Sequence, residues 1–325
     1  MLCDSLLKGQ SVLLALTALT LSSLSALCQS ALTPSSTTQV VLLGTGTPGP
    51  LPERSGPSTA VIVNGTPYLV DLGPGVVRRA TAAYRKGREE KLWDDGQGPH
   101  FSALKMAFIT HLHSDHTVGY PDFIFTPWVV GRAAPVDVYG PKGIQEMTQH
   151  ITEAWKEDIR IRTEGMEREL PEHNDTGYKV NAHVVSPGII YRDKNVTVTA
   201  FNVKHGEWGP DAFGYRFETP DRIIVISGDT GPSQTTIDAC NGCDILVHEV
   251  YSQKGFDSQS PAWQRYKLQY HTSPKQLGEL AAKAKPKLLV ITHQIYHTAN
   301  EEDLVKEMMA SYKGKFVSGH DLDIF

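Results

Sequence analysis

Short apolar runs alternate with longer amphipathic stretches from Gln39 to the end of the chain. Runs of about four to eight apolar or β-branched residues between turn residues are typical of strands, and apolar residues that recur every three or four positions predict helices. The expected strands are residues 40–43, 60–63, 68–71, 106–110, 136–139, 196–203, 214–218, 223–227, 245–248 and 288–292. The expected helices are residues 76–86, 120–131, 144–157, 233–239, 274–284 and 301–311. Because strands and helices interleave with no break in composition, residues 39–325 are expected to form one α/β (α+β) domain.

Two stretches of this pattern need separate interpretation. Several expected strands follow one another closely, at residues 60–71 and 196–227, as in hairpins, so the sheets should be mixed. Residues 160–192 are polar and only weakly periodic. We interpret them as a long excursion loop.

The first thirty residues differ from the rest of the chain. A weakly positive start with Lys8 leads into an apolar run at residues 11–27, and small residues such as Ala26 and Ser30 follow. This order is typical of a secretory signal peptide. We therefore expect a signal peptide at residues 1–30, a polar linker at 31–38 and export to the periplasm or the medium, with no membrane segment in the mature form.

Composition and cysteine usage narrow the classes of function. A hydrophobic content of 40% with 21% charged residues is typical of a globular protein, and the net charge of −5 excludes a general attraction for nucleic acid or anionic lipid. Cys240 and Cys243 are the cysteines that remain after signal removal. A zinc ribbon would need a second pair, so a structural disulfide or two free thiols is favoured, with a redox site as the alternative.

A cluster of metal-ligand residues follows the expected strand at residues 106–110. The segment Thr110-His-Leu-His-Ser-Asp-His-Thr117 places four potential ligands within six residues: His111, His113, Asp115 and His116. In an extended chain His116 would point away from the other three, so all four can converge only if the loop turns at residues 114–115. Imidazole nitrogens and carboxylate oxygens suit zinc, with iron and manganese as competitors. The alternative, a solvated polar loop with accidental histidines, explains a lone histidine better than this cluster.

Three more ligand-type residues follow separate expected strands. His205, Asp229 and His293 lie just after residues 196–203, 223–227 and 288–292. Each alone could be a surface histidine or a capping aspartate. Because α/β folds build their sites at strand ends, the three residues together indicate the rest of a metal centre.

These motifs resemble the ordered motifs of the metallo-β-lactamase superfamily. The resemblance rests on HLHSDH at residues 111–116, on His205, on the Ser-Gly-Asp that ends at Asp229 and on the Thr-His-Gln around His293. It implies an αβ/βα sandwich of two mixed sheets with helices on the outer faces and two divalent metal ions, with zinc expected, at the edge of the sheets. It assigns His111, His113 and His205 to the first ion, Asp115, His116 and His293 to the second, and Asp229 to both. Asp71 would orient the histidine loop.

Within the superfamily the sequence is most similar to ribonuclease Z and its arylsulfatase-like relatives. The similarity lies in Phe-Gly-Tyr-Arg at residues 213–216, Val-His-Glu-Val at 247–250 and Tyr-His-Thr-Ser at 270–273. It implies that Glu249 orients His271 as a general acid. His271 could instead be a solvent contact at a helix start, and Glu249 a salt-bridged strand end. The catalytic residues that we expect are Asp115, His271 and Glu249.

The expected function is a dinuclear metal-dependent hydrolase whose metal-bound hydroxide attacks a phosphodiester or related ester bond. The alternatives are an exported enzyme that hydrolyses β-lactams or lactones and, from another class, a non-catalytic metal-binding scaffold. The expected partner is a small-molecule ester, with Trp208 as a wall of its pocket, and a homodimer is left open. Transfer RNA is disfavoured as a substrate because no RNA-gripping arm stands out in the sequence.

Overall fold

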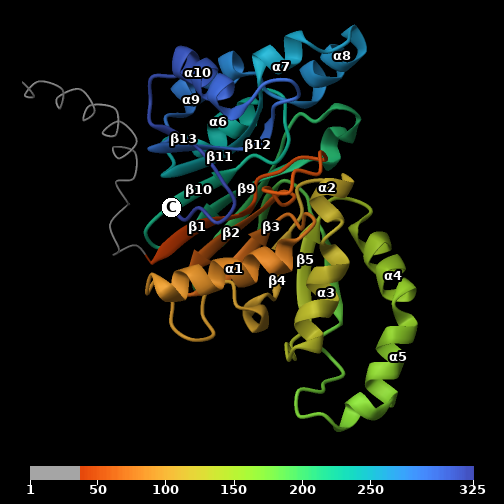
Figure 1. The fold of residues 1–325 in the computed structure, drawn as a ribbon. Coiled ribbons are helices and arrows are strands. Elements are labelled where there is room, and N and C mark those ends of the chain that lie inside the picture. Colours follow the sequence, from red (N-terminus) through yellow and green to blue (C-terminus); the bar gives the residue numbers. More distant parts are fainter. Residues whose placement is uncertain (1–36) are drawn as a thin grey trace, which may run out of the picture. The chain divides into compact units, whose positions relative to one another are not determined.

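The computed structural model describes residues 37–325, so the predicted signal peptide and most of the predicted linker lie outside the described residues. Two sheets face each other, and the described residues form the αβ/βα sandwich of two mixed sheets that the resemblance implies (Figure 1). The first sheet has the order β1 (Thr38–Gly44), β2 (Ser58–Val63), β3 (Thr66–Val70), β4 (Met106–Phe108), β5 (Val136–Gly140) and β6 (Val180–Val184). The second has the order β13 (Phe316–Ser318), β12 (Leu288–Ile295), β11 (Ile245–Tyr251), β10 (Ile223–Ile226), β9 (Phe213–Glu218), β8 (Thr197–Asn202) and β7 (Gly188–Arg192).

Both sheets join an antiparallel half to a parallel half. Strands β1 to β3 pair antiparallel and β3 to β6 pair parallel, while β7 to β10 pair antiparallel and β10 to β13 pair parallel. The tightest hairpin joins β2 to β3 through Asn64 and Gly65, which both have positive φ angles, of 49° and 75°. Two such residues give the turn whose twist matches that of the flanking strands. The hairpin and the mixed sheets were both expected from the sequence.

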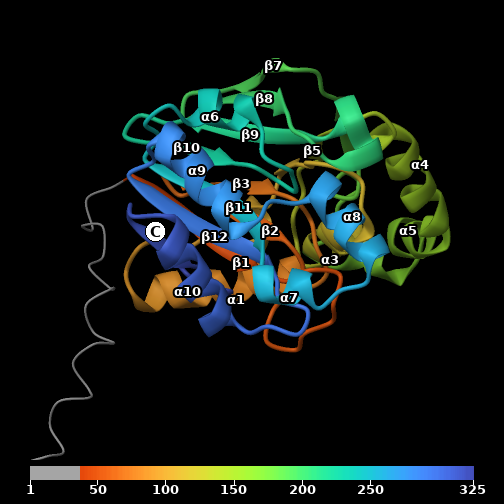
Figure 2. The same ribbon diagram turned by 90° about the horizontal axis from the view of Figure 1, so that it is seen from above.

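Helices cover the outer face of each sheet (Figures 1 and 2). Helices α1 (Val76–Glu89), α3 (Tyr120–Val129) and α4 (Ile144–Ala154) share a buried cluster with the first sheet. Helices α6 (Gln234–Cys240), α9 (Pro274–Ala284) and α10 (Glu301–Ser311) share another with the second sheet. The remaining helices are α2 (Ser114–Thr117), α5 (Lys156–Glu164), α7 (Gln253–Asp257) and α8 (Pro261–Tyr270). Among residues 37–325, no helix has the length and apolar character needed to cross a membrane.

The central strands are apolar on both faces because they are covered on both sides. In β1, Val41 and Leu43 face the helices, and Val40 and Leu42 face the other sheet. A strand buried on both faces reads as a continuous apolar run rather than as an alternating pattern. Four aromatic residues follow the ligand segment at residues 111–116 in the sequence: Tyr120, Phe123, Phe125 and Trp128. They are part of the buried cluster between the first sheet and its helices.

The structure corrects the interpretation of residues 160–192 as a long excursion loop. Helix α5 extends to Glu164, and strands β6 and β7 occupy residues 180–184 and 188–192. Both strands lie at the edges of their sheets and bury their side chains only partly, so their periodicity is weak. The single helix expected at residues 144–157 is also two helices, because the chain breaks at Trp155.

Cys240 and Cys243 form a disulfide that closes the turn between α6 and β11. Both cysteines are fully buried. The structural-disulfide interpretation is therefore confirmed over that of two free thiols.

Candidate metal centre and active site

The segment of residues 111–116, called the metal loop below, turns at residues 114–115. Strand β4 ends at Phe108, and helix α2 begins at Ser114, directly after His113. This one-turn helix swings Asp115 and His116 back toward the side chains that precede it, so the loop bends at residues 114–115 as expected.

Asp71 anchors this loop from the end of β3. Its carboxylate accepts hydrogen bonds from the Thr110 backbone N–H at 2.8 Å and from the Thr110 hydroxyl, and it lies 2.8 Å from His116 Nδ1. Asp71 itself has a positive φ angle of 63°. The loop that contains Gly73 and the loop that contains Gly119 are in direct backbone contact, because a Cβ atom added at Gly119 would clash with the Gly73 carbonyl oxygen. Asp71 thus orients the loop, as the resemblance implies.

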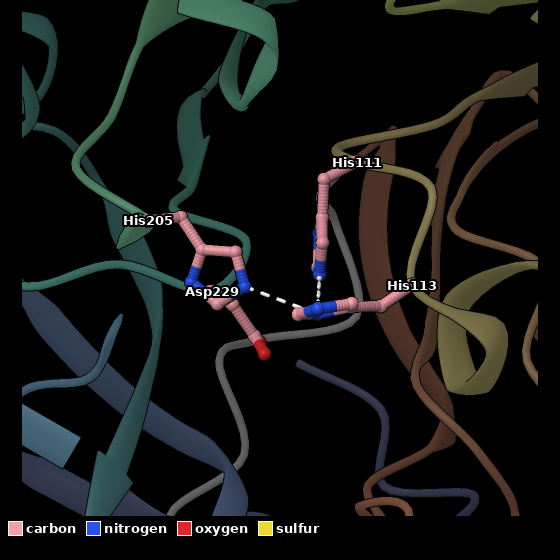
Figure 3. A group of neighbouring side chains, drawn as sticks. All are labelled: His111, His113, His205 and Asp229. Atoms are coloured by element: carbon pink, nitrogen blue, oxygen red, sulfur yellow. Dashed lines mark hydrogen bonds between the residues drawn. The ribbon is translucent and has the colours of Figure 1, made fainter. Parts of the chain in front are cut away.

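The first cluster comprises His111, His113, His205 and Asp229, whose ligand atoms lie within 4.8 Å of one another. Figure 3 shows the three imidazoles converging beside the Asp229 carboxylate. His113 Nδ1 lies 2.9 Å from His111 Nε2 and 3.2 Å from His205 Nε2. His205 Nδ1 lies 2.9 Å from the Tyr270 carbonyl oxygen, which can only accept. The Nδ1 of His205 therefore carries the proton, and its Nε2 lone pair faces the centre of the cluster.

The second cluster comprises Asp115, His116 and His293. His293 Nε2 lies 3.2 Å from Asp115 Oδ2 and 3.5 Å from Asp229 Oδ2. His116 Nε2 lies 3.5 Å from Asp229 Oδ1. Asp229 therefore belongs to the first cluster and touches the second with both of its carboxylate oxygens, so it lies between the two.

His293 reaches the centre through a bulge in strand β12. Glu249 of β11 pairs with Thr292 and the next residue, Val250, pairs with Gln294, so His293 is the extra residue. It has a positive φ angle of 45°. A bulge re-aims one side chain without ending the strand, and here it turns an imidazole to the edge of the sheet. Asp229 follows the glycine-containing turn after β10, where Gly228 has a φ angle of 62° and packs on Thr110.

The unpaired ring nitrogens fit metal ions. His116 Nδ1 lies 2.8 Å from Asp71 Oδ2, and its buried Nε2 faces carboxylate oxygens with no hydrogen bond. Burial opposes it, but Asp229 and Asp71 raise the pKa of His116 well above its usual value, and Asp229 and Asp115 likewise raise the pKa of His293. The carboxylates therefore favour a positive charge at the second cluster.

The pKa values of two imidazoles in the first cluster shift in the opposite direction. Burial lowers the pKa of His205 to about 3 and that of His111 well below its usual value. Both rings stay neutral, which is the form that binds a metal ion. The seven residues of the two clusters therefore suit two adjacent divalent cations in donor type, and His111 and His205 suit them in protonation as well.

His271 and Glu249 lie together at the side of the two clusters. His271 Nδ1 is 3.5 Å from Glu249 Oε2 and 4.0 Å from Asp229 Oδ2. Glu249 Oε1 accepts from the backbone N–H of Thr272 at 2.9 Å, which ties the carboxyl group to the segment that carries His271. Burial raises the pKa of Glu249 well above its usual value and lowers that of His271 to about 3. The burial of both residues excludes solvent contact and a surface salt bridge as explanations, and their roles as general acid and orienting carboxyl group stay a prediction.

Trp208 also lies at the centre. Its indole N–H points at His113 Nε2 at 2.9 Å, and the two ring centroids are 5.1 Å apart. Its placement beside a candidate ligand agrees with its expected position on the wall of the site.

Helix α8 was missed by the sequence analysis although it brings further side chains to the site. Tyr270 stacks on Tyr266 with centroids 4.1 Å apart and meets the His205 ring edge-on at 4.9 Å. Lys267 of the same helix is also largely buried. The signal that could have revealed α8 is Ser260-Pro261, since proline favours the first turn of a helix.

Comparison with known proteins agrees with this fold. Residues 68–294 match the family model described as the beta-lactamase superfamily domain. Ribonuclease Z of Mycobacterium bovis is 31% identical over 293 residues, which cover 87% of this chain and 96% of that protein. Ribonuclease Z of Mycobacterium marinum is 31% identical with the same coverage.

Solved structures agree on the fold. The human short-form tRNase Z has a TM-score of 0.63 at 20% identity and covers 88% of this chain and 98% of its own. The metallo-β-lactamase fold protein YhfI from Bacillus subtilis has a TM-score of 0.64 at 17% identity and covers 89% of this chain and 100% of its own.

Fold and site together define a metallo-hydrolase that acts on ester bonds. The chain belongs to the metallo-β-lactamase superfamily and, within it, to the ribonuclease Z family.

Proposed function

We propose that this protein is a dinuclear, zinc-dependent phosphodiester hydrolase that is exported and acts on small esters. The observation that carries the proposal is the position of Asp229, one carboxylate in contact with both ligand clusters. A carboxylate that serves two adjacent cations is the arrangement of two-metal hydrolytic sites.

The ligand roles follow from the two clusters. His111, His113 and His205 would hold one ion, the second cluster would hold the other, and Asp229 would serve both. Bound there, two divalent ions supply an activated water nucleophile and stabilise the negative charge that develops on the attacked group. Asp115 is oriented by its contact with His293, 3.2 Å from Oδ2 to Nε2.

The proton for the leaving group comes from His271. Its buried Nδ1 faces Glu249, so its Nε2 is the nitrogen that meets the substrate. Glu249 is itself held by the Thr272 N–H, and it fixes the orientation of the imidazole ring. Because burial lowers the pKa of His271 and raises that of Glu249, the imidazole is neutral and the carboxyl group holds a proton. His271 would pass its Nε2 proton to the departing oxygen while the Glu249 proton moves to Nδ1, so that no imidazolate forms.

Aromatic rings around the clusters support a small substrate. Trp208 lies against His113 on one side, and Tyr266 and Tyr270 stack on each other beside His205 and His271. Rigid rings around a few polar groups are typical of small-molecule sites. The Mycobacterium bovis and Mycobacterium marinum relatives are both named ribonuclease Z, which favours a phosphodiester over a β-lactam or a lactone. The presence of all seven expected ligands disfavours the non-catalytic scaffold.

Helix α5 supports the view that transfer RNA is a poor substrate. It carries three basic and three acidic residues, and Arg160 and Arg162 pair with Glu157 and Asp158 of the same helix. RNA binding needs basic side chains that are free to meet phosphates. This segment, which projects beside α4 in Figure 1, offers a balanced surface instead.

The disulfide supports export. Cys240 and Cys243 are bonded, and disulfides persist mainly in secreted and periplasmic proteins. This agrees with the signal peptide expected at residues 1–30.

A chromogenic panel tests the proposed function. The metal-loaded protein is assayed with an aryl phosphodiester, an aryl sulfate, an aryl lactone and a cephalosporin that share similar leaving groups. We expect the phosphodiester to have the highest kcat/KM, with activity lost on chelation and restored by zinc. Fastest turnover of the cephalosporin or the lactone would contradict the choice of substrate class.

The same preparation is assayed with precursor transfer RNA from 50 to 300 mM salt. We expect slow cleavage, together with phosphodiester hydrolysis that changes little with salt, because a small ester makes few phosphate contacts. Rapid, strongly salt-sensitive and site-specific cleavage of the precursor would contradict the small-substrate proposal.

A further inference from the structure

Lys267 is a buried cation without a partner. It lies on helix α8, and only 8% of its surface is exposed. Among residues 37–325 its ammonium forms no ion pair and no side-chain hydrogen bond. Lysine is almost never buried this deeply unless it is paired, since desolvation of the charge is costly. The Nζ atom itself keeps some accessible surface, since it is not among the fully buried polar atoms that lack a partner. The position therefore needs an explanation other than folding stability.

Lys267 lies one helical turn before His271, whose backbone N–H donates to the Lys267 carbonyl oxygen at 2.9 Å. Burial and then Asp229 have the largest effects on the pKa of His271, and Lys267 has the strongest effect of the neighbouring cations. Burial lowers the pKa of Lys267 itself, against the carboxylates of Glu249 and Asp229. Lys267 therefore lies close to the proposed acid and to the carboxylates around it.

The neighbours of Lys267 on α8 confirm that this face of the helix adjoins the site. Tyr266 and Tyr270 lie one residue before and three residues after it, and the Tyr266 ring is 6.1 Å from the His271 ring. Asp229 and Glu249 offer no direct partner, because neither lies within ion-pair distance of the ammonium. Bound divalent cations would leave these carboxylates with even less negative charge to share with it. The Lys267 ammonium therefore lacks an anion to pair with.

We propose that Lys267 binds an anionic oxygen of the substrate and selects anionic esters over neutral ones. The inference rests on the proposed function and narrows its substrate class to esters that carry a negative charge next to the scissile bond, as a phosphodiester does. An ammonium is a compact point charge with three donors, which suits a phosphoryl oxygen. A carboxylate elsewhere on the substrate offers the same chemistry, so the test separates the two.

The kinetic test compares Lys267→Met with Lys267→Arg. Methionine keeps the apolar stem and removes the charge. A charge-assisted hydrogen bond is lost, so KM for an anionic aryl phosphodiester should rise by about 10- to 100-fold, with a smaller change in kcat. KM for a neutral aryl carboxylate ester with the same leaving group should stay unchanged. Lys267→Arg should restore much of the affinity, and Lys275→Met, which removes an exposed lysine of α9, should change neither substrate.

The binding test does not depend on turnover. Phenylphosphonate and benzoate are titrated calorimetrically into each metal-loaded variant. We expect Lys267→Met to weaken phenylphosphonate by about 10- to 100-fold and benzoate by less. A larger loss for benzoate would show that a substrate carboxylate is the partner and would overturn the phosphoryl assignment. Equal affinity of wild type and Lys267→Met for phenylphosphonate would overturn the inference altogether.

Thermal unfolding completes the test. Because an unpaired buried charge destabilises the fold, Tm of Lys267→Met should rise above that of the wild type. A fall in Tm would assign Lys267 a structural role and contradict the inference. If the wild type hydrolyses neither ester, the proposed function fails, and the phosphonate affinities still decide the role of Lys267.

Discussion

Replacement of Asp229 by alanine is expected to reduce kcat/KM by at least about 10³-fold, more than any single histidine replacement. One oxyanion-stabilising donor already contributes about 10²–10³-fold in other enzymes, and Asp229 touches both ligand clusters. Its removal should lower the metal content of the purified protein as well as the rate. Elemental analysis and initial rates on the same preparation provide the measurement.

The matched controls separate charge from shape. Asp229→Asn keeps the size of the side chain and should be nearly as inactive, because the amide lacks the negative charge that two cations share. Asp257→Ala removes an exposed carboxylate and should leave both readouts unchanged. If Asp229→Ala keeps full metal content and loses no more activity than His293→Ala, Asp229 does not bridge the two ions.

Replacement of His271 by alanine is expected to have an effect that depends on the leaving group. General acid catalysis contributes about 10²–10⁴-fold when the departing oxygen needs a proton. Hydrolysis of alkyl phosphodiesters should therefore fall by about that factor, whereas nitrophenyl esters, which depart without a proton, should be cleaved almost as fast as by the wild type. A plot of log kcat against the pKa of the leaving group gives the measurement, and its slope should become steeper in the variant.

His150→Ala is the control for this series, since its side chain is exposed on α4 and makes only a surface contact with Glu146. Glu249→Gln should behave like a weaker form of His271→Ala, because it changes the group that orients the ring. An equal loss of rate across all leaving groups would assign His271 a structural role instead.

The metal loop and the strand-end ligands could be predicted because their signals are local. Residues 111–116 carry four ligand types in six positions, and His205, Asp229 and His293 each follow a recognisable apolar strand. Ligand residues at the ends of several strands meet at one edge of the sheets once the strands pair. The ten expected strands and six expected helices all correspond to elements of the structure, because their apolar patterns are local signals as well.

The features that sequence could not reveal depend on tertiary contacts. Strands β6 and β7 are held by pairing with β5 and β8, not by a strong pattern of their own. The bulge at His293 arises from the register of β12 on β11, which no local motif encodes. Lys267 looks like any surface lysine in the sequence, and only the packing of α8 shows that it is buried beside the active site.

The metal content of the protein, purified without chelator, tests the central claim most directly. The account predicts close to two equivalents of divalent metal per chain, mainly zinc, because two ligand clusters meet at Asp229. Chelation should lower Tm, and addition of zinc should restore both Tm and the two equivalents. A value near zero after attempted reconstitution would contradict the account, and a value that saturates at one equivalent would contradict its dinuclear site.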